Sequence, residues 1–462
     1  VDTHRAAGDF DLLAFNLSKA DAKALAGFTI RCQPGDKEPY YLLNQLQFAK
    51  GSQHAQDPRL PPNSTFNSPI HKFRWLHVPG SAHQGLKPFY GPYTYTVTPR
   101  YCGPDGALLP IDESRGVTLK VDVKPFTKGR LSLGFTRGFV QSQAFVHHFG
   151  PKAHIVPPGK PLDFDTTVEA GRNARGQAYT YDQEYEWLGF TAQDRIFEIL
   201  DEVVADKSLR LDVFAYDLGE PYVASALLKL AGQKRVRVIL DDAALHRSTD
   251  GKTTSEDAFA KAFARLDKAS IKRGHFGRYA HDKVLIVSDR KTEGSGGARK
   301  VLTGSTNFSI TGLYVNSNHV VVYDDPKVAG TYAEVFEAAW KGDVKTAAFL
   351  KTPLSQKPFD FGGRGVPDTT ITFSPHKPEV ADGILGGLVE RVEAEGKKKA
   401  GNVLFAVMEL GAGSSSTVYK ALNALHKEQN IFSFGISDNP DGISLYKPGV
   451  KRGLLVTGTP AS

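Results

Sequence analysis

The sequence HDKVLIVSD at residues 281–289, followed by VLTGSTNFS at residues 301–309, contains the pattern that decides this fold. Each segment is a mostly apolar run of strand length, and the polar residues 290–300 between them predict a hairpin. Side chains alternate along a strand, so His281 and Lys283 are expected on one face and Asp282 on the other. The hairpin should therefore present an imidazole and an ammonium group side by side.

A histidine next to a lysine in this arrangement suits a phosphate-binding site. The imidazole can attack phosphorus or carry a proton, while the ammonium group binds the non-bridging oxygens. The turn at Gly304 and Ser305 can add a hydroxyl and backbone N–H groups, and the Asn307 amide can donate to the same oxygens. We therefore expect His281, Lys283 and Asn307 to be catalytic, and Lys283, Ser305 and Asn307 to bind the phosphate.

These residues resemble the HKD signature of the phospholipase D superfamily, in which an HxK segment is followed by GSxN. The resemblance extends from the helix near Thr191 to Trp340 and implies an α/β fold. It also implies cleavage of a phosphodiester through a phosphohistidine on His281, without a metal ion or other cofactor, and the sequence shows no metal-ligand spacing. In the family an acidic residue occupies the position of Ser288, whereas this chain has Asp289 one residue later. We expect Asp289 to play a supporting, structural role.

The segment before the hairpin alternates helices with apolar strands. It is expected to contain a helix from Thr191, a strand at 209–216 with Asp217 near its end, a helix at 223–230 and a strand at 236–240. Strands that are apolar on both faces and alternate with helices predict a layered α/β sheet. We expect Asp217, and His319 after the hairpin, to support or line the pocket.

Part of this α/β pattern recurs near the C-terminus. The sequence LFAVMELG at 404–411 lines up with DVFAYDLG at 212–219, so Glu409 takes the position of Asp217 and is a further supporting candidate. Two copies so far apart indicate a duplicated lobe rather than a short-repeat solenoid. We expect a first lobe at 180–342 with the HKD motif, a linker at 343–369, and an incomplete second lobe at 370–462 without the motif.

The N-terminal part of the chain reads as β structure. Short apolar or alternating runs, among them 28–30, 93–97, 117–121 and 131–135, are separated by Gly, Pro, Asn and Asp and predict a β-sandwich accessory domain at 1–150. The sequence YTYTVTPRY at 93–101 resembles a late strand of fibronectin-type-III-like modules, which implies a binding or positioning role. The expected architecture is thus multidomain: an all-β sandwich followed by duplicated α/β lobes, the second of them incomplete.

Composition limits the class of protein. The chain has 462 residues, a formal net charge of +7, 40% hydrophobic residues and 23% charged residues. These values exclude a disordered, collagen-like or coiled-coil chain, and no apolar run is long enough for a membrane-spanning helix. Cys32 and Cys102 are too few for a disulfide framework or a four-cysteine zinc site, and both a bridge between them and two thiols are compatible with the sequence. Secreted and cytoplasmic locations are equally compatible.

The family resemblance implies two HKD sets, of which one histidine is phosphorylated and the other protonates the leaving oxygen. The second copy would place its histidine beyond Ser462, so we expect it to come from a second polypeptide or from a missing C-terminal segment. The leading hypothesis is a phospholipase D-type phosphodiesterase, hydrolysing or transferring a phosphodiester, with a phospholipid favoured as substrate. The alternatives are an HKD-type endonuclease acting on DNA or RNA and a non-catalytic binding scaffold.

Overall fold

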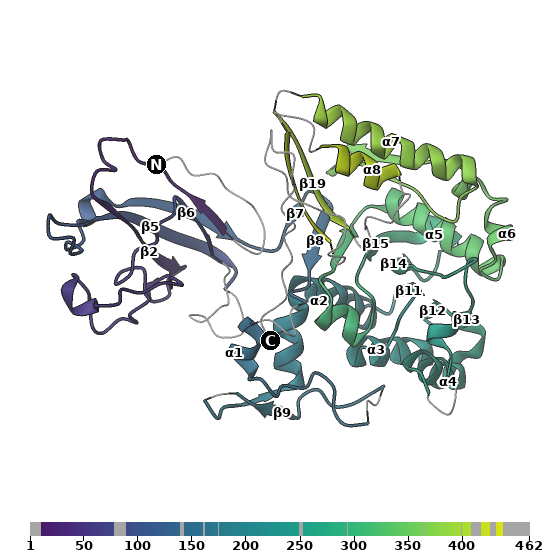
Figure 1. Ribbon diagram of the computed structural model, residues 1–462. Coiled ribbons are helices and arrows are strands. Elements are labelled where there is room, and N and C mark those ends of the chain that lie inside the picture. The colour runs from purple at the N-terminus through teal and green to yellow at the C-terminus, as the bar shows by residue number, and fades with distance from the viewer. Residues whose placement is uncertain are drawn as a thin grey trace.

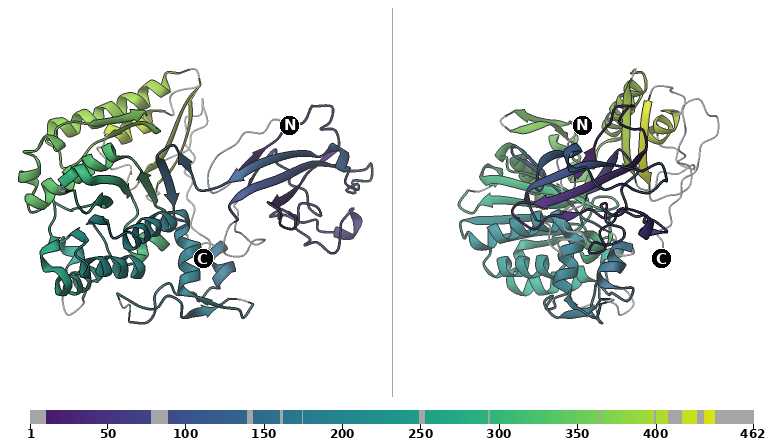
Figure 2. Two further views of the ribbon diagram at one scale, coloured as in Figure 1. Left: turned by 180° about the vertical axis from the view of Figure 1, so that it is seen from behind. Right: turned by 90° about the vertical axis from the view of Figure 1, so that its left-hand side faces the viewer.

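Figure 1 shows the computed structural model: helices surround one large sheet, and a group of N-terminal strands extends from one side of this body. The two further views in Figure 2 show the same separation of the N-terminal strands from the α/β body. The structure describes residues 11–77, 89–138, 143–159, 162–173, 175–248, 253–292, 294–363, 365–398, 400–407, 417–425 and 431–437.

The large sheet has eight strands in the order β13-β12-β11-β14-β15-β16-β8-β7. Strands β11, β12 and β13 are parallel, and the other neighbouring pairs are antiparallel. The predicted hairpin is confirmed, because β14 and β15 pair with Leu285 opposite Leu302. The strands are β7 (Thr127–Lys128), β8 (Leu131–Phe135), β11 (Leu209–Ala215), β12 (Val236–Leu240), β13 (Ile271–Arg273), β14 (Lys283–Asp289), β15 (Ala298–Gly304) and β16 (His319–Tyr323).

Helices cover both faces of this sheet, which explains why its central strands are apolar on both sides. Along β14, Leu285 and Val287 pack in one core with α2, α3 and α4, whereas Val284 and Ile286 pack in a second core with α5 and α6. The helices are α1 (Gln143–Phe149), α2 (Tyr181–Ala205), α3 (Pro221–Gly232), α4 (Ser255–Asp267), α5 (Pro326–Lys341) and α6 (Thr346–Phe349). The helix predicted from Thr191 begins ten residues earlier, at Tyr181, with Thr180 as its N-cap and a break at Phe190, where φ is 47°.

The N-terminal β unit ends earlier than the sequence predicts. The run 131–135 was expected in a sandwich at 1–150, but as β8 it pairs with β16 in the large sheet. Helix α2 packs closely on β8, since a Cβ on Gly134 would lie 2.5 Å from the backbone oxygen of Thr191. Phe145 and Phe149 of α1 also join the core of the α/β body. The described residues 127–135 and 143–149 therefore belong to that body, and the boundary at residue 150 is wrong.

The remaining N-terminal strands form two antiparallel sheets, and the described residues between 11 and 123 contain no α-helix. Phe28, Ile30, Tyr93 and Tyr95 are buried in their shared core. Cys32 and Cys102 do not form a disulfide with each other. One sheet contains β3 (Tyr40–Tyr41), β2 (Leu25–Pro34), β5 (Gly91–Tyr101) and β6 (Val117–Val123), and the other contains β1 (Asp11–Ala14) and β4 (Arg74–His77).

The segment expected as a linker at 343–369 is largely folded onto the α/β body. Phe349, Leu354 and Val366 are buried in the same core as α5, so this segment is packed structure rather than a free connection. Beyond it, α7 is followed by two parallel strands with α8 between them. The elements are β17 (Phe359–Gly363), β18 (Val366–Ile371), α7 (Pro378–Gly396), β19 (Gly401–Val407), α8 (Thr417–Ala424) and β20 (Ile431–Ser437).

Several short elements complete the described chain. A two-stranded ribbon, β9 (Glu169–Arg172) and β10 (Ala178–Thr180), precedes α2. The short helical turns are η1 (Gly51–Gln53), η2 (Glu113–Arg115), η3 (Ala244–His246), η4 (Lys268–Ser270), η5 (Gly294–Gly297), the π-helical η6 (Thr311–Val315) and η7 (Pro353–Ser355). Among the described helices, none is both long enough and apolar enough to cross a bilayer.

Candidate active site

The predicted phosphate-binding residues meet at one edge of the large sheet. Strand β14 is antiparallel to β11, so Lys283 at its start pairs with Ala215 at the end of β11. Strand β15 is antiparallel to β14, which brings Gly304 at its end to the same edge. We call this edge, with the loops that follow β11, β12 and β15, the HKD edge.

His281 and Lys283 both contact the ring of Tyr216. The imidazole of His281 meets this ring edge-on with centroids 4.3 Å apart, and Nζ of Lys283 lies 4.4 Å from the ring centroid. His281 is exposed, whereas Lys283 is only 5% exposed. Nζ of Lys283 donates a hydrogen bond to the backbone oxygen of His281 at 2.8 Å. The two side chains therefore lie together, with the imidazole open to solvent and the ammonium group beneath it.

Burial changes the protonation of this pair. Desolvation, followed by the charge of Lys283, lowers the pKa of His281, so its imidazole is neutral near pH 7. Desolvation also lowers the pKa of Lys283 to about 8, which leaves the ammonium form dominant but weakly held at neutral pH. Attack on a phosphate requires a neutral imidazole as the nucleophile and a protonated lysine that can bind the phosphate oxygens, and this pair has both.

Asp282 occupies the other side of the strand start. Its charge acts on Tyr332 of α5, which belongs to the core on the opposite face of the sheet from α2. Burial raises the pKa of Asp282 to about 6. The alternation of side chains along the strand thus continues through the two residues before β14, so that Asp282 lies on the other side from His281 and Lys283.

The loop after β15 supplies the hydroxyl and amide groups. The left-handed φ of 148° at Gly304 and the 2.3 Å that would separate its Cβ from the backbone oxygen of His319 require glycine there. Oγ of Ser305 lies 3.0 Å from Nδ1 of His319, so these two residues hold each other at the rim. Oδ1 of Asn307 is buried without a hydrogen-bond partner among the described residues. The Asn307 side-chain oxygen is therefore not engaged by the fold among the described residues.

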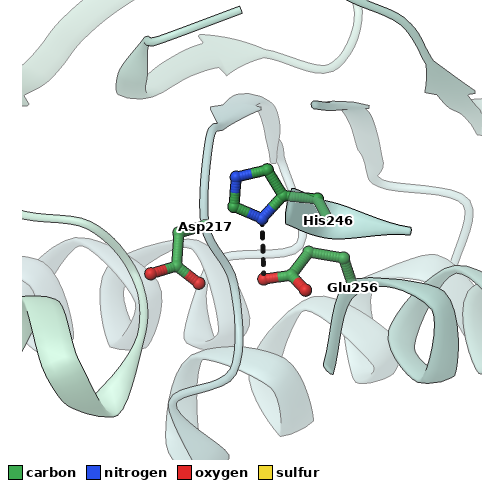
Figure 3. Close-up of side chains that lie close together, drawn as sticks. All are labelled: Asp217, His246 and Glu256. Atoms are coloured by element: carbon green, nitrogen blue, oxygen red, sulfur yellow. Dashed lines mark ion pairs between the residues drawn. The ribbon is translucent and has the colours of Figure 1, made fainter. Parts of the chain in front are cut away.

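Asp217 joins a cluster with His246 and Glu256 beside this site, and Figure 3 shows the three side chains converging. Nδ1 of His246 lies 3.5 Å from Oε1 of Glu256, and Oγ of Ser309 donates to Oδ2 of Asp217 at 2.6 Å. Burial and then a hydrogen bond with Glu256 raise the pKa of Asp217 to about 6. Asp217 therefore positions the loop after β15 through Ser309.

The same cluster has the composition of a metal site. The ligand atoms of Asp217, His246 and Glu256 lie within 4.8 Å of one another. Among the described residues, this is the group of His, Cys, Asp or Glu side chains that lie close enough to bind one metal ion. The interaction of Asp217 with Glu256 favours the protonated form of the Asp217 carboxyl group, because two neighbouring carboxylates repel each other when both are ionised. Burial opposes protonation of His246, but its contacts with Glu256 and Asp241 prevail and raise its pKa.

Three of the predicted supporting residues lie in different surroundings. Asp289 is at the opposite end of β14 from His281 and pairs with Arg299, so it belongs to the structural frame rather than to the HKD edge. His319 is at the HKD edge, and burial lowers its pKa. Glu409 lies outside the described residues.

Sequence reasoning missed several residues that shape this edge: Tyr216, Asp241, His246, Glu256 and Ser309. The carboxylate of Asp241 is fully buried and accepts the backbone N–H groups of Ala243 and Ala280 at 2.9 and 2.6 Å. It thereby ties the loop after β12 to the residue just before His281. A carboxylate directly after a buried strand, as with Asp217, was the available signal for Asp241. His246 and Glu256 carry no such signal because they come from a loop and a helix.

Residues 204–340 match the family model described as cardiolipin synthase, PLD-like domain. This segment is a phospholipase D-like domain. The chain is 29% identical over 138 residues to the mitochondrial cardiolipin hydrolase of Xenopus laevis and 28% identical over the same length to that of Xenopus tropicalis. Both matches cover 30% of this chain and 56% of the relative, so the chain spans about half the length of the curated relatives it matches.

Similarity among solved structures is weaker. Nuc of Salmonella typhimurium, described as a phospholipase D family member, matches 32% of this chain and 86% of its own with 23% identity and a TM-score of 0.24. This value is too low to bear on function. The similarity to proteins named as hydrolases therefore comes from the sequence matches. The family-model match at residues 204–340 includes His281, Lys283 and Asn307.

Proposed function

We propose that this protein is a hydrolase of phosphodiesters in which His281 is the nucleophile. The observation that carries the proposal is the pairing of an exposed, neutral His281 with the buried ammonium group of Lys283 at the ring of Tyr216. Similarity to cardiolipin hydrolases, and the family-model match that includes these residues, support it.

The arrangement of the HKD edge supports the following roles. An imidazole nitrogen of His281 attacks phosphorus, the bond from phosphorus to the leaving oxygen breaks, and a phosphohistidine forms. Lys283 and Asn307 stabilise the charge on the non-bridging oxygens, with Ser305 at the rim. A second histidine gives its proton to the leaving oxygen and then takes one from water, which attacks phosphorus and breaks the phosphorus–nitrogen bond.

We propose that this second histidine comes from another polypeptide or from a segment beyond the described residues. Residues 370–462 would be a partial second lobe: α7, β19, α8 and β20 repeat the order of α2, β11, α3 and β12, and both strand pairs are parallel. Residues 11–123, with two packed antiparallel sheets, would be an accessory β-sandwich that positions the substrate or a partner.

The proposed substrate is a phospholipid phosphodiester. Support comes from the two curated relatives, which are named for cardiolipin hydrolysis. The net charge of +7 suits any anionic diester and does not favour lipid over nucleic acid. Substrate panels decide between them: an endonuclease would cut DNA or RNA with strong salt dependence, whereas a lipase would release headgroups from vesicles.

The experiment that tests the nucleophile is replacement of His281 by Ala and by Asn in the complete assembly. Loss of a nucleophile costs about 10⁴-fold or more in kcat, and the acid-labile phosphohistidine should disappear with it. His154→Asn, in an exposed loop after α1, is the matched control and should keep full activity. Hydrolysis retained in both His281 variants would contradict the proposal, and a wild-type assembly that binds diesters without cutting them would favour the scaffold.

A further inference from the structure

A second cationic site lies at the edge of the large sheet opposite to the HKD edge. A cavity of about 380 Å³ opens there between the starts of β11 and β12, the end of β14 and helix α5. Its described lining contains five basic side chains, Arg210, Lys234, Arg235, Arg237 and Arg290, against two carboxylates, Asp212 and Glu337. We call it the arginine cavity. Its volume falls in the range of pockets for small ligands.

Three of the five cations are already engaged by the fold. Asp212 is 2% exposed and accepts hydrogen bonds from Arg210 at 2.9 Å and from Arg237 at 2.8 Å. Arg237 also donates to Glu337 at 2.6 Å. The guanidinium of Arg235 is buried and donates to backbone oxygens at the end of α2 and the start of β11. These three residues form the floor of the cavity, and both carboxylates are consumed by them.

Lys234 and Arg290 remain at the rim without counter-charge. Both are exposed, and neither side chain has an ion pair or hydrogen bond with another described residue. Burial, and after it the charge of Arg290, lowers the pKa of Arg235, so the two guanidinium groups repel each other across the cavity. An anion bound between them would remove this repulsion.

The backbone at Lys234 gives an independent reason to assign a role to its side chain. Its φ is 55°, the left-handed conformation that follows the end of α3 and that normally selects glycine or asparagine. A lysine here carries a conformational cost, and such strain concentrates where a side chain serves a ligand. The cost is explained if the ammonium group is needed at the rim.

We propose that the arginine cavity binds a phosphate group, either as inorganic phosphate or as the monophosphate of a nucleotide, through Lys234 and Arg290. The floor arginines supply the surrounding positive potential, and a phosphate dianion matches the charge that the rim leaves uncompensated. The site is separate from the HKD edge and does not depend on the proposed hydrolysis.

The test is titration calorimetry with inorganic phosphate and with AMP at low ionic strength, in a His281→Ala, Lys283→Met background that removes phosphate binding at the HKD edge. One site should remain. Adding Lys234→Gly and Arg290→Gln should weaken it about tenfold or more, because each substitution removes a charge-assisted contact. Glycine also suits the left-handed φ at position 234, so the variant should fold at least as well as its parent.

Lys327→Gln, an exposed lysine at the start of α5, is the control for the loss of one charge and should leave the affinity unchanged. AMP binding markedly tighter than phosphate would identify a nucleotide, and equal affinities would identify free phosphate. Phosphate binding that survives the Lys234→Gly, Arg290→Gln pair, or that weakens equally with Lys327→Gln, would overturn the proposal. In the otherwise wild-type chain the pair should leave hydrolysis at the HKD edge intact, so the two proposals fail separately.

Discussion

Lys283 and Arg237 are cations near opposite edges of the same sheet, and their surroundings differ in kind. Arg237 is held by Asp212 and Glu337 and stacks within 4.9 Å of the Phe336 ring. Lys283 donates only to a backbone oxygen and rests over Tyr216. Ion pairs outweigh burial and raise the pKa of Arg237, whereas burial lowers that of Lys283 to about 8.

The difference teaches how one sheet can contain a structural and a functional cation. A buried charge with carboxylate partners stabilises the fold only as a complete set, because removal of one partner leaves the other charge uncompensated. A buried charge without carboxylate partners costs stability and is suited to bind an anion that arrives later. Each of the following predictions separates these two situations.

The largest effect is expected from Asp212→Ala. It leaves Arg210 and Arg237 without their shared carboxylate, and the free energy of unfolding should fall by about 3–5 kcal/mol. Denaturant titration measures this change. Asp289→Ala, which removes an ion pair whose side chains are 31% and 53% exposed, is the control and should cost less than about 1 kcal/mol. Equal losses of unfolding free energy in the two variants would show that the buried ion pairs of Asp212 stabilise the fold no more than the exposed pair of Asp289.

The next effect concerns Lys283→Met, which replaces the buried ammonium group with an apolar side chain of similar length. Loss of one positioned donor should lower kcat/KM for a phosphodiester by about 10²–10³-fold. Stability should stay constant or rise, since no ion pair is broken and a desolvated charge disappears. Parallel rate and denaturation measurements check the two outcomes. A large loss of stability would show that Lys283, like Arg237, stabilises the fold.

The smallest effect is a pH dependence that comes from Lys283. Its pKa is about 8 in the folded state against 10.5 for a free lysine, so the unfolded chain binds more protons between these values. Stability should therefore rise as the pH increases from about 8 towards 10.5, whereas hydrolysis, which needs the ammonium form, should fall above about 8. The lowered pKa of His281 confines the acidic decline to pH values below 6.5.

Rate–pH profiles and denaturant midpoints across the same range measure both trends. Lys283→Arg should move the alkaline decline of activity to higher pH, because a guanidinium keeps its proton there. Lys283→Met should abolish the rise in stability above pH 8. If the wild-type protein and Lys283→Arg both keep constant activity above pH 8, protonation of the Lys283 ammonium group is not required for the reaction.

The sequence predicted those parts of the molecule that depend on local geometry. The runs at 209–216, 236–240, 281–289 and 301–309 indicated strands, and the structure contains β11, β12, β14 and β15 at 209–215, 236–240, 283–289 and 298–304. The placement of His281 and Lys283 together, apart from Asp282, followed from the two-residue period of a strand. These features were accessible because they depend on residues close in the sequence.

Other features could not be read in this way. The run 131–135 has the same alternating character as the N-terminal strands, so its membership in the large sheet depends on pairing with β16, nearly two hundred residues away. Asp289 looks like part of the HKD motif in the sequence but lies at the far edge beside Arg299. The contacts of Asp217 with His246, Glu256 and Ser309 join four separate segments.

The sequence by itself determined the strand that carries HxK, the turn at Gly304 and the phosphate chemistry that these residues make possible, because backbone geometry within a few residues dictates them. Only the tertiary structure decided that Lys283 is buried without an ion pair, which carboxylates neutralise Arg237, and which basic residues at the opposite edge lack a counter-charge. Burial and distance between segments control electrostatics, and neither is defined until the chain has folded.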